Sequence, residues 1–213
     1  MNRNIQQIGC ILMASGLSVR YGKNKLLEKL DGREIILHTA GRLAEAGMKP
    51  LAVTRSEEVK TLLDREEIAC IIHNGPLKSD TIHEGIRYLK PDAAGYLFMP
   101  ADQPLIKASS LQRMAEQFFR NPERAVRLAW GDIPGSPVLF PASCREALLA
   151  YRGDRGGMDV IRQQGIPCDP VQAEYEWELW DADTPEKMAE IRAIYSRTGR
   201  AYMARCLTKN GAL

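Results

Sequence analysis

The feature that most constrains the fold is the alternation of short apolar runs with amphipathic stretches over the first hundred residues. The apolar runs, rich in Ile, Leu and Val, cover residues 8–13, 51–54, 70–73 and 95–99. Helical periodicity lies between them, over residues 33–46, 57–66 and 80–89. Such alternation predicts βαβ units. We therefore expect an α/β protein with a doubly wound, mostly parallel sheet and helices on both faces.

Beyond residue 101 the pattern is less regular. It predicts helices over residues 109–120, 143–150 and 158–164 and strands over 125–130, 138–140 and 179–180. A last helix opens at residues 183–186, where a capping side chain precedes Pro185. No Pro/Gly/Ser-rich linker interrupts the chain, so residues 1–197 are expected to form one domain. Residues 198–213 form either a helix extension or a frayed tail.

Composition excludes several classes of partner. The 213 residues include 29 Lys and Arg against 27 Asp and Glu, a net charge of +2, without a basic stripe. We therefore expect no nucleic-acid partner. The first apolar run is too short to span a membrane, so no membrane partner is expected. The five cysteines are scattered and never spaced as CxxC, which favours a reducing cytoplasm.

The segment after the first strand, residues 14–25, combines glycines with three cations. Glycines let backbone N–H groups turn toward an anion, while Arg20 and Lys25 can neutralise phosphate. The spacing of Gly16 and Gly22 fits neither a Walker A loop nor a G-x-G-x-x-G dinucleotide motif. The segment is thus either an unconventional phosphate-binding loop or a solvated basic loop.

Two aspartates follow predicted strands. Asp102 comes directly after the run at 95–99, and Asp183 follows the strand expected at 179–180. Ligands of open parallel sheets collect at the carboxyl edge, where the basic loop also emerges. Two carboxylates beside bound phosphate suit Mg²⁺. The alternatives are a turn residue for Asp102 and a helix cap for Asp183.

At this point the residues resemble a known family. The loop ending in Leu26 and Leu27 is similar to the LAAGxSxRMGxNKLL signature of MobA-like nucleotidyltransferases, in particular the molybdenum cofactor cytidylyltransferase branch. Further segments resemble family elements in the same order: residues 74–85, 101–104 (ADQP), 135–140 (GSPVLF), 153–156 (GDRG) and 181–185 (DADTP). Together they cover about residues 7–194.

The resemblance implies a Rossmann-like sheet of the nucleotide-diphospho-sugar transferase type. It implies Mg²⁺-dependent transfer of CMP from CTP to molybdopterin, with release of pyrophosphate and a molybdenum hydroxylase as recipient of the product. Lys25, Arg20 and Asp102 would be catalytic, and Asp102 and Asp183 would hold the metal. Nucleotide and pterin contacts are expected from Leu12, Ala14, Ser15, Gly16, Asn74, Ser79, Thr81, Gly135, Pro137, Gly153 and Asp154.

Alternatives follow from departures within these motifs. Residues 23–27 (KNKLL) fit the cytidylyl pattern better than the guanylyl one, so CTP is favoured over GTP. Ser15, Tyr21 and Met158 differ from the family pattern, which leaves a noncatalytic molybdenum cofactor-binding or insertion factor as an alternative. Use of GTP, or of another phosphate acceptor in the same fold, is a third.

Overall fold

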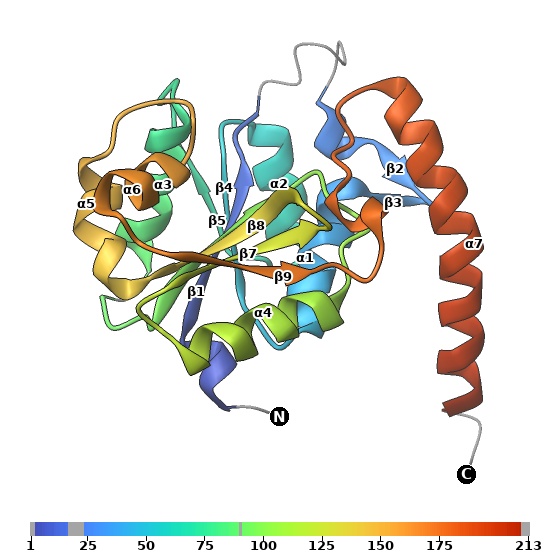
Figure 1. Ribbon diagram of the computed structural model, residues 1–213. Coiled ribbons are helices and arrows are strands. Elements are labelled where there is room, and N and C mark those ends of the chain that lie inside the picture. Colours follow the sequence, from blue (N-terminus) through green and yellow to red (C-terminus); the bar gives the residue numbers. More distant parts are fainter. Residues whose placement is uncertain (1–2, 17–23, 90, 210–213) are drawn as a thin grey trace.

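The computed structural model describes residues 3–16, 24–89 and 91–209. Within these residues the central sheet has seven strands in the order β5-β4-β1-β6-β8-β7-β9 (Figure 1). Their bounds are β1 Ile8–Ala14, β4 Pro50–Thr54, β5 Cys70–Ile72, β6 Gly95–Pro100, β7 Ala125–Trp130, β8 Ile133–Pro141 and β9 Cys168–Gln172. β1 pairs in parallel with β4 and β6, and β4 with β5. The predicted α/β, mostly parallel sheet is confirmed.

One strand of the sheet, β8, is antiparallel to its neighbours. β8 runs antiparallel to both β6 and β7, while β7 and β9 are parallel. The predicted strand at 179–180 is wrong, because residues Glu176–Leu179 form a 3₁₀ turn. The strand at the edge of the sheet beside β7 is β9, which contains Pro170. Proline lacks an N–H donor and is tolerated at the edge of a sheet, so this polar segment can pair there although its sequence is a poor strand signal.

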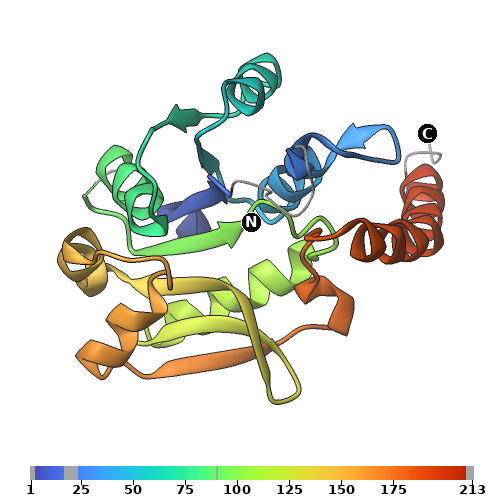
Figure 2. The same ribbon diagram turned by 90° about the horizontal axis from the view of Figure 1, so that it is seen from above.

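Helices cover both faces of the sheet (Figure 2). They are α1 Ile35–Glu45, α2 Glu57–Arg65, α3 Lys78–Tyr88, α4 Ala108–Arg120, α5 Arg145–Ala150, α6 Met158–Gln164 and α7 Pro185–Lys209. Side chains of β1 alternate between the two cores, as its pleat requires. Leu12 packs with α1 and α4, whereas Ile11 packs with α3 and α6. The strand is therefore buried on both sides.

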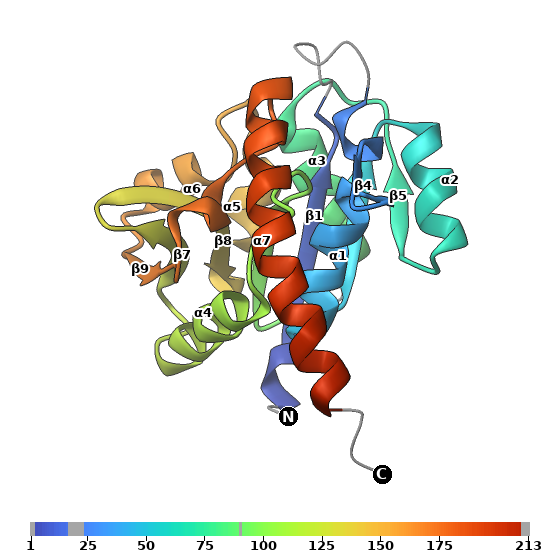
Figure 3. The same cartoon turned by 90° about the vertical axis from the view of Figure 1, so that its right-hand side faces the viewer.

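A short hairpin and the last helix form a third packing unit. β2 Lys29–Leu30 and β3 Arg33–Glu34 pair through a turn in which Asp31 and Gly32 have positive φ. This turn is why α1 begins at residue 35 rather than 33. Met188 and Ile191 of α7 pack against Leu30 of the hairpin. Figure 3 shows α7 outside α1, and the helix continues through the boundary expected at 197/198. None of the helices in the described ranges has the length and apolarity needed to cross a membrane.

Candidate active site

A cavity of about 670 Å³ opens at the carboxyl edge of the parallel strands. This volume lies within the range of small-molecule sites, roughly 300–1,000 Å³. Its lining includes Ser15, Gly16, Lys25, Arg55, Lys78, Thr81, Asp102, Ser136, Asp154, Arg155, Met158, Asp181 and Asp183. The cavity therefore extends along the carboxyl edge of the sheet from the loop before α6 to the loop before α7 (Figure 1).

The ammonium of Lys25 lies between two carboxylates. Nζ donates to Asp102 Oδ2 and to Asp183 Oδ1. The side chains of Lys25 and Asp102 are 12% and 15% exposed, and that of Asp183 is 53% exposed. Burial lowers the pKa of Lys25, but the charge and hydrogen bond of Asp102, followed by those of Asp183, outweigh it and raise the pKa above its ordinary value. Lys25 is thus held as a cation.

Local structure places Lys25 and Asp102 together. Lys25 begins a 3₁₀ turn whose cap is Asn24, with Oδ1 accepting from Leu26 N at 3.2 Å. Leu26 is buried in the core on the α1 and α4 side, which fixes the turn against the sheet. Asp102 follows β6, the parallel neighbour of β1. Since adjacent parallel strands end at the same edge, the two side chains meet there.

A third carboxylate adjoins this pair. Gln103 Nε2 donates to Asp181 Oδ1 at 2.8 Å, and Ala182 N donates to the carbonyl of Asp102 at 2.9 Å. Burial, and next the negative charge of Asp102, raise the pKa of Asp181 to about 6. The segment 181–183 is therefore tied to the residues after β6, and this region has an excess of negative charge.

Asp183 is not the cap of α7. Thr184 performs this role, because its Oγ1 accepts from Lys187 N at 3.2 Å. The carboxylate of Asp183 points instead to Lys25. The alternative interpretation of this aspartate from sequence is thereby corrected, and its carboxylate is available to a ligand in the cavity.

The acidic pair fits a divalent cation. Asp102 and Asp183 come from separate segments yet share one positive charge, the ammonium of Lys25. Among the residues that the structure describes, no group of three or more His, Cys, Asp or Glu is arranged to ligate a metal. Two carboxylates are nevertheless the donor set that Mg²⁺ uses when substrate phosphates and water complete its coordination.

The cavity wall near β1 and β4 is built around Ser15. His73 Nδ1 accepts from Gly75 N at 3.2 Å, which assigns the ring hydrogen to Nε2. Nε2 then donates to Ser15 Oγ at 2.8 Å, and this hydroxyl donates to the carbonyl of Val53 at 3.1 Å. Arg55 donates from Nε and Nη2 to the carbonyl of Ser15 at 3.0 and 2.8 Å. Burial, and next the charge of Arg55, lower the pKa of His73, so the ring is neutral.

The opposite wall joins α3 to the loop before α6. Asp154 Oδ1 accepts from Lys78 N at 2.9 Å, at the first turn of α3. Ser79 N donates to the carbonyl of Gly153 at 3.1 Å, and Gly153 N donates back to Ser79 Oγ at 3.3 Å. Asp154 therefore has a structural role in addition to its place in the lining.

The predicted residues divide into three groups. The cavity brings together Ser15, Gly16, Lys25, Thr81, Asp102, Asp154 and Asp183. Arg20 lies outside the described residues. The others do not line the cavity: Leu12 and Ala14 are buried within β1, Asn74 is exposed, Ser79 bonds Gly153, Gly135 packs against Leu179, and Pro137 and Gly153 adjoin lining residues.

Three charged cavity residues received no predicted role: Arg55, Lys78 and Asp181. Arg55 follows the strand expected at 51–54, so the rule that identified Asp102 also applied to it. Asp181 lies in the motif that contains Asp183 but received no role. Lys78 has no comparable signal, since it does not follow a strand. Arg155, which also lines the cavity, lies in the GDRG element at residues 153–156.

An open, mostly parallel sheet with a cationic and acidic cavity at its carboxyl edge is typical of α/β proteins that bind a ligand at this edge. Residues 10–168 match the sequence model described as the MobA-like NTP transferase domain. Because this match covers well over half of the chain, the protein belongs to the MobA-like NTP transferase family. It is an enzyme of the nucleotidyltransferase class.

Known relatives agree with this assignment. The chain is 29% identical over 193 residues to a probable molybdenum cofactor guanylyltransferase of Bacillus cereus (strain Q1), covering 85% of this chain and 94% of the relative. Among solved structures, a nucleotidyl transferase from Methanothermobacter thermautotroptrophicus superposes with a TM-score of 0.78 at 23% identity, over 90% and 98% of the two chains. A Mycobacterium tuberculosis protein solved in complex with manganese superposes with a TM-score of 0.73 at 17% identity, over 88% and 98%. At these identities the structures support the fold alone.

Proposed function

We propose that this enzyme transfers a nucleoside monophosphate from a nucleoside triphosphate to the terminal phosphate of molybdopterin and releases pyrophosphate. The observation that carries the proposal is the convergence of Lys25, Asp102 and Asp183 in one cavity. The relative named a molybdenum cofactor guanylyltransferase supports the choice of acceptor. The four cysteines whose side chains are described are free thiols, in keeping with the cytoplasmic location we propose.

The chemistry demands charge neutralisation more than proton transfer. An acceptor phosphate oxygen attacks the α-phosphorus, the bond from that phosphorus to the α,β-bridging oxygen breaks, and pyrophosphate leaves with the electron pair. Asp102 and Asp183 would hold a divalent cation, for which we propose Mg²⁺, whose positive charge would offset that of the phosphates. The acceptor phosphate is already ionised near neutral pH, so we assign no general base.

Lys25 is the residue of this chain that acts on the phosphates. Its ammonium is a cation already oriented at the sheet edge, and it can exchange carboxylate oxygens for those of the triphosphate. A cation that is already in place before the reaction is the kind of group that stabilises a charged transition state. Arg20 remains the second cation we propose for the leaving pyrophosphate.

We propose CTP as the donor. The lining near β1 and β4 offers Arg55 as a donor of hydrogen bonds, and it has no carboxylate among the described residues. Cytosine presents two adjacent acceptors, O2 and N3, which suit a guanidinium. Guanine presents N–H donors on the corresponding edge, which suit a carboxylate. The KNKLL segment supports the same choice.

GTP is the second candidate donor, favoured by the name of the Bacillus cereus relative. Arg55 separates the two. In Arg55→Met the loss of the guanidinium is expected to weaken CTP use more than GTP use if cytosine O2 and N3 are its targets.

We propose that a molybdenum hydroxylase receives the dinucleotide product.

The experiment is a panel of CTP, GTP, ATP and UTP with molybdopterin, followed by pyrophosphate release. CTP with molybdopterin and Mg²⁺ is expected to react, and Asp102→Asn is expected to abolish the reaction while leaving the circular dichroism spectrum intact. Lys60→Met, an exposed lysine on α2, serves as the control. Binding of the pterin without turnover for any triphosphate would instead support a noncatalytic cofactor-binding factor.

A further inference from the structure

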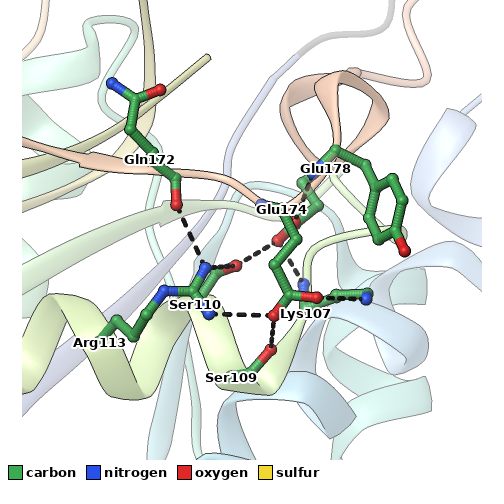
Figure 4. Close-up of polar contacts among 8 residues, drawn as sticks. Lys107, Ser109, Ser110, Arg113, Gln172, Glu174 and Glu178 are labelled. Carbon is green, nitrogen blue, oxygen red and sulfur yellow. Dashed lines mark hydrogen bonds and ion pairs between the residues drawn. The ribbon is translucent and has the colours of Figure 1, made fainter. Parts of the chain in front are cut away.

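A buried glutamate lies behind the acidic pair. Glu178 is fully buried, and both of its carboxylate oxygens accept two hydrogen bonds (Figure 4). Oε2 accepts from Lys107 N at 3.1 Å and from Ser110 Oγ at 2.6 Å. Oε1 accepts from Glu174 N at 2.8 Å and from Tyr175 N at 3.2 Å. One side chain thus joins the start of α4 to the segment after β9.

The carboxylate of Glu178 is buried among hydrogen-bond donors. A buried charge costs several kcal/mol unless its lone pairs are satisfied, and an apolar residue would fill the same space at lower cost. Here four donors replace water, and the N-terminus of α4 adds its positive dipole end. No salt bridge to Glu178 is formed by the residues that the structure describes. Its effect is therefore to fix geometry between two segments.

A second layer of contacts surrounds Glu178. Glu174 accepts from Lys107 Nζ at 2.6 Å, from Ser109 Oγ at 2.7 Å and from Arg113 Nη1 at 3.0 Å. The side chains of Glu174, Lys107 and Arg113 are about one third exposed. Figure 4 shows these contacts beside α4. Exposed pairs contribute little, about 0–1 kcal/mol. Glu174 is thus a matched control for Glu178, since it joins the same two segments at the surface.

The two joined segments are those that bear the acidic pair. Lys107 lies five residues after Asp102, and Glu178 lies five residues before Asp183. At the other end of both segments Ala182 N donates to the carbonyl of Asp102 at 2.9 Å. The two segments are therefore held together at both of their ends: the first connection lies beside Lys25, and the second is made by Glu178. A change at Glu178 can alter the spacing of the two aspartates without touching either.

We propose that Glu178 is a positioning residue that sets the distance between Asp102 and Asp183 required to hold a divalent cation. The inference rests on the proposed role of these two aspartates as the metal site. It predicts that loss of the buried carboxylate weakens metal binding in a protein that remains folded.

The test compares Glu178→Gln with Glu174→Gln. The glutamine keeps the size of the side chain, but its NH₂ group faces donors, so one of the two joined segments loses its acceptor. Mn²⁺ is titrated into each protein without nucleotide, and the free ion is counted by its electron paramagnetic resonance signal. Residues behind metal ligands typically change affinity by 10–100-fold, so we expect about 10-fold weaker binding in Glu178→Gln. Glu174→Gln is expected to bind as the wild type does.

Ser110→Ala provides a second variant if Glu178→Gln fails to fold, because it removes the 2.6 Å bond to Glu178 and, with it, the bond that Ser110 Oγ accepts from Arg113 Nη2 at 2.9 Å. It is expected to weaken Mn²⁺ binding in the same direction. Equal Mn²⁺ affinity in the wild type and in the folded variants, with only the melting temperature lowered, overturns the role of Glu178 and leaves the metal site intact. Mn²⁺ binding by the wild type that cannot be distinguished from that of Asp102→Asn, both without nucleotide and with CTP present, overturns the proposed metal site itself.

Discussion

Replacement of Lys25 by Met is expected to destabilise the protein and to increase its response to Mg²⁺. The change keeps an unbranched side chain as far as the ε position but removes the cation between Asp102 and Asp183. Breaking a buried ion pair costs about 3–5 kcal/mol. Asp102 is 15% exposed, but Asp183 is 53% exposed and is screened by water, so the lower end applies. We expect about 3 kcal/mol.

For a chain of this size 1 kcal/mol corresponds to roughly 2–4 °C, so the melting temperature should fall by about 6–12 °C without divalent cations. Mg²⁺ should restore part of this loss, by about 1.4 kcal/mol at ten times its Kd. The shift caused by Mg²⁺ should be larger in Lys25→Met than in the wild type, because the ammonium no longer competes for the same carboxylates.

The assay is differential scanning fluorimetry with and without Mg²⁺. Lys60→Met is the matched control, since Lys60 pairs with Asp64 on the surface of α2 and should change stability by less than about 1 kcal/mol. A melting temperature of Lys25→Met equal to that of the wild type, or a Mg²⁺ shift larger in the wild type, would refute the reasoning.

Three further predictions concern groups away from Lys25. Hydrogen bonds from neighbouring cations and a serine lower the pKa of Glu174 to about 2. The contribution of Glu174 to stability is therefore complete above about pH 4.5 and is lost as pH falls toward 2. In urea titrations of Glu174→Gln this pH-dependent contribution to the free energy of unfolding should be missing. In Gly85→Ala the new Cβ would lie 2.7 Å from Ile11 Cδ1, and overpacking of about 1–3 kcal/mol should appear as a lower urea midpoint; an unchanged midpoint contradicts the packing. Burial, and next the charge of Arg152, lower the pKa of His83, so the unfolded chain binds the proton more tightly and stability should fall as pH drops below about 6.5; His83→Gln should flatten this dependence.

The sequence was sufficient for the parts that repeat a simple rule. Strands buried on both faces are continuous apolar runs, and polar residues directly after them lie at one edge of a parallel sheet. This rule places Asp102 at the cavity, on the edge where the loop that ends at Lys25 also emerges. Asp183 follows a 3₁₀ turn and not a strand, so the rule does not account for its place in the cavity. β9 was missed because an edge strand need not be apolar, and Asp169 and Pro170 conceal its pattern.

The role of Glu178 could not be predicted. Glutamates occur at positions 174, 176 and 178, and nothing in their spacing distinguishes the buried one from the exposed ones. Its burial depends on donors from α4, about seventy residues earlier in the chain. Gly135, expected at the pterin from its motif, packs closely against Leu179, and nothing in the motif indicates this contact.

Transfer of a nucleotidyl group by the cavity around Lys25 is tested by following the α-phosphate. The enzyme is incubated with molybdopterin, Mg²⁺ and α-³²P-labelled CTP, and in parallel with labelled GTP. We expect the label to enter the pterin product with one pyrophosphate released per label, and Lys25→Met to lose this transfer by about 10²–10³-fold. Label that stays in the triphosphate with both donors, in enzyme that binds them, would show that the cavity does not transfer nucleotidyl groups.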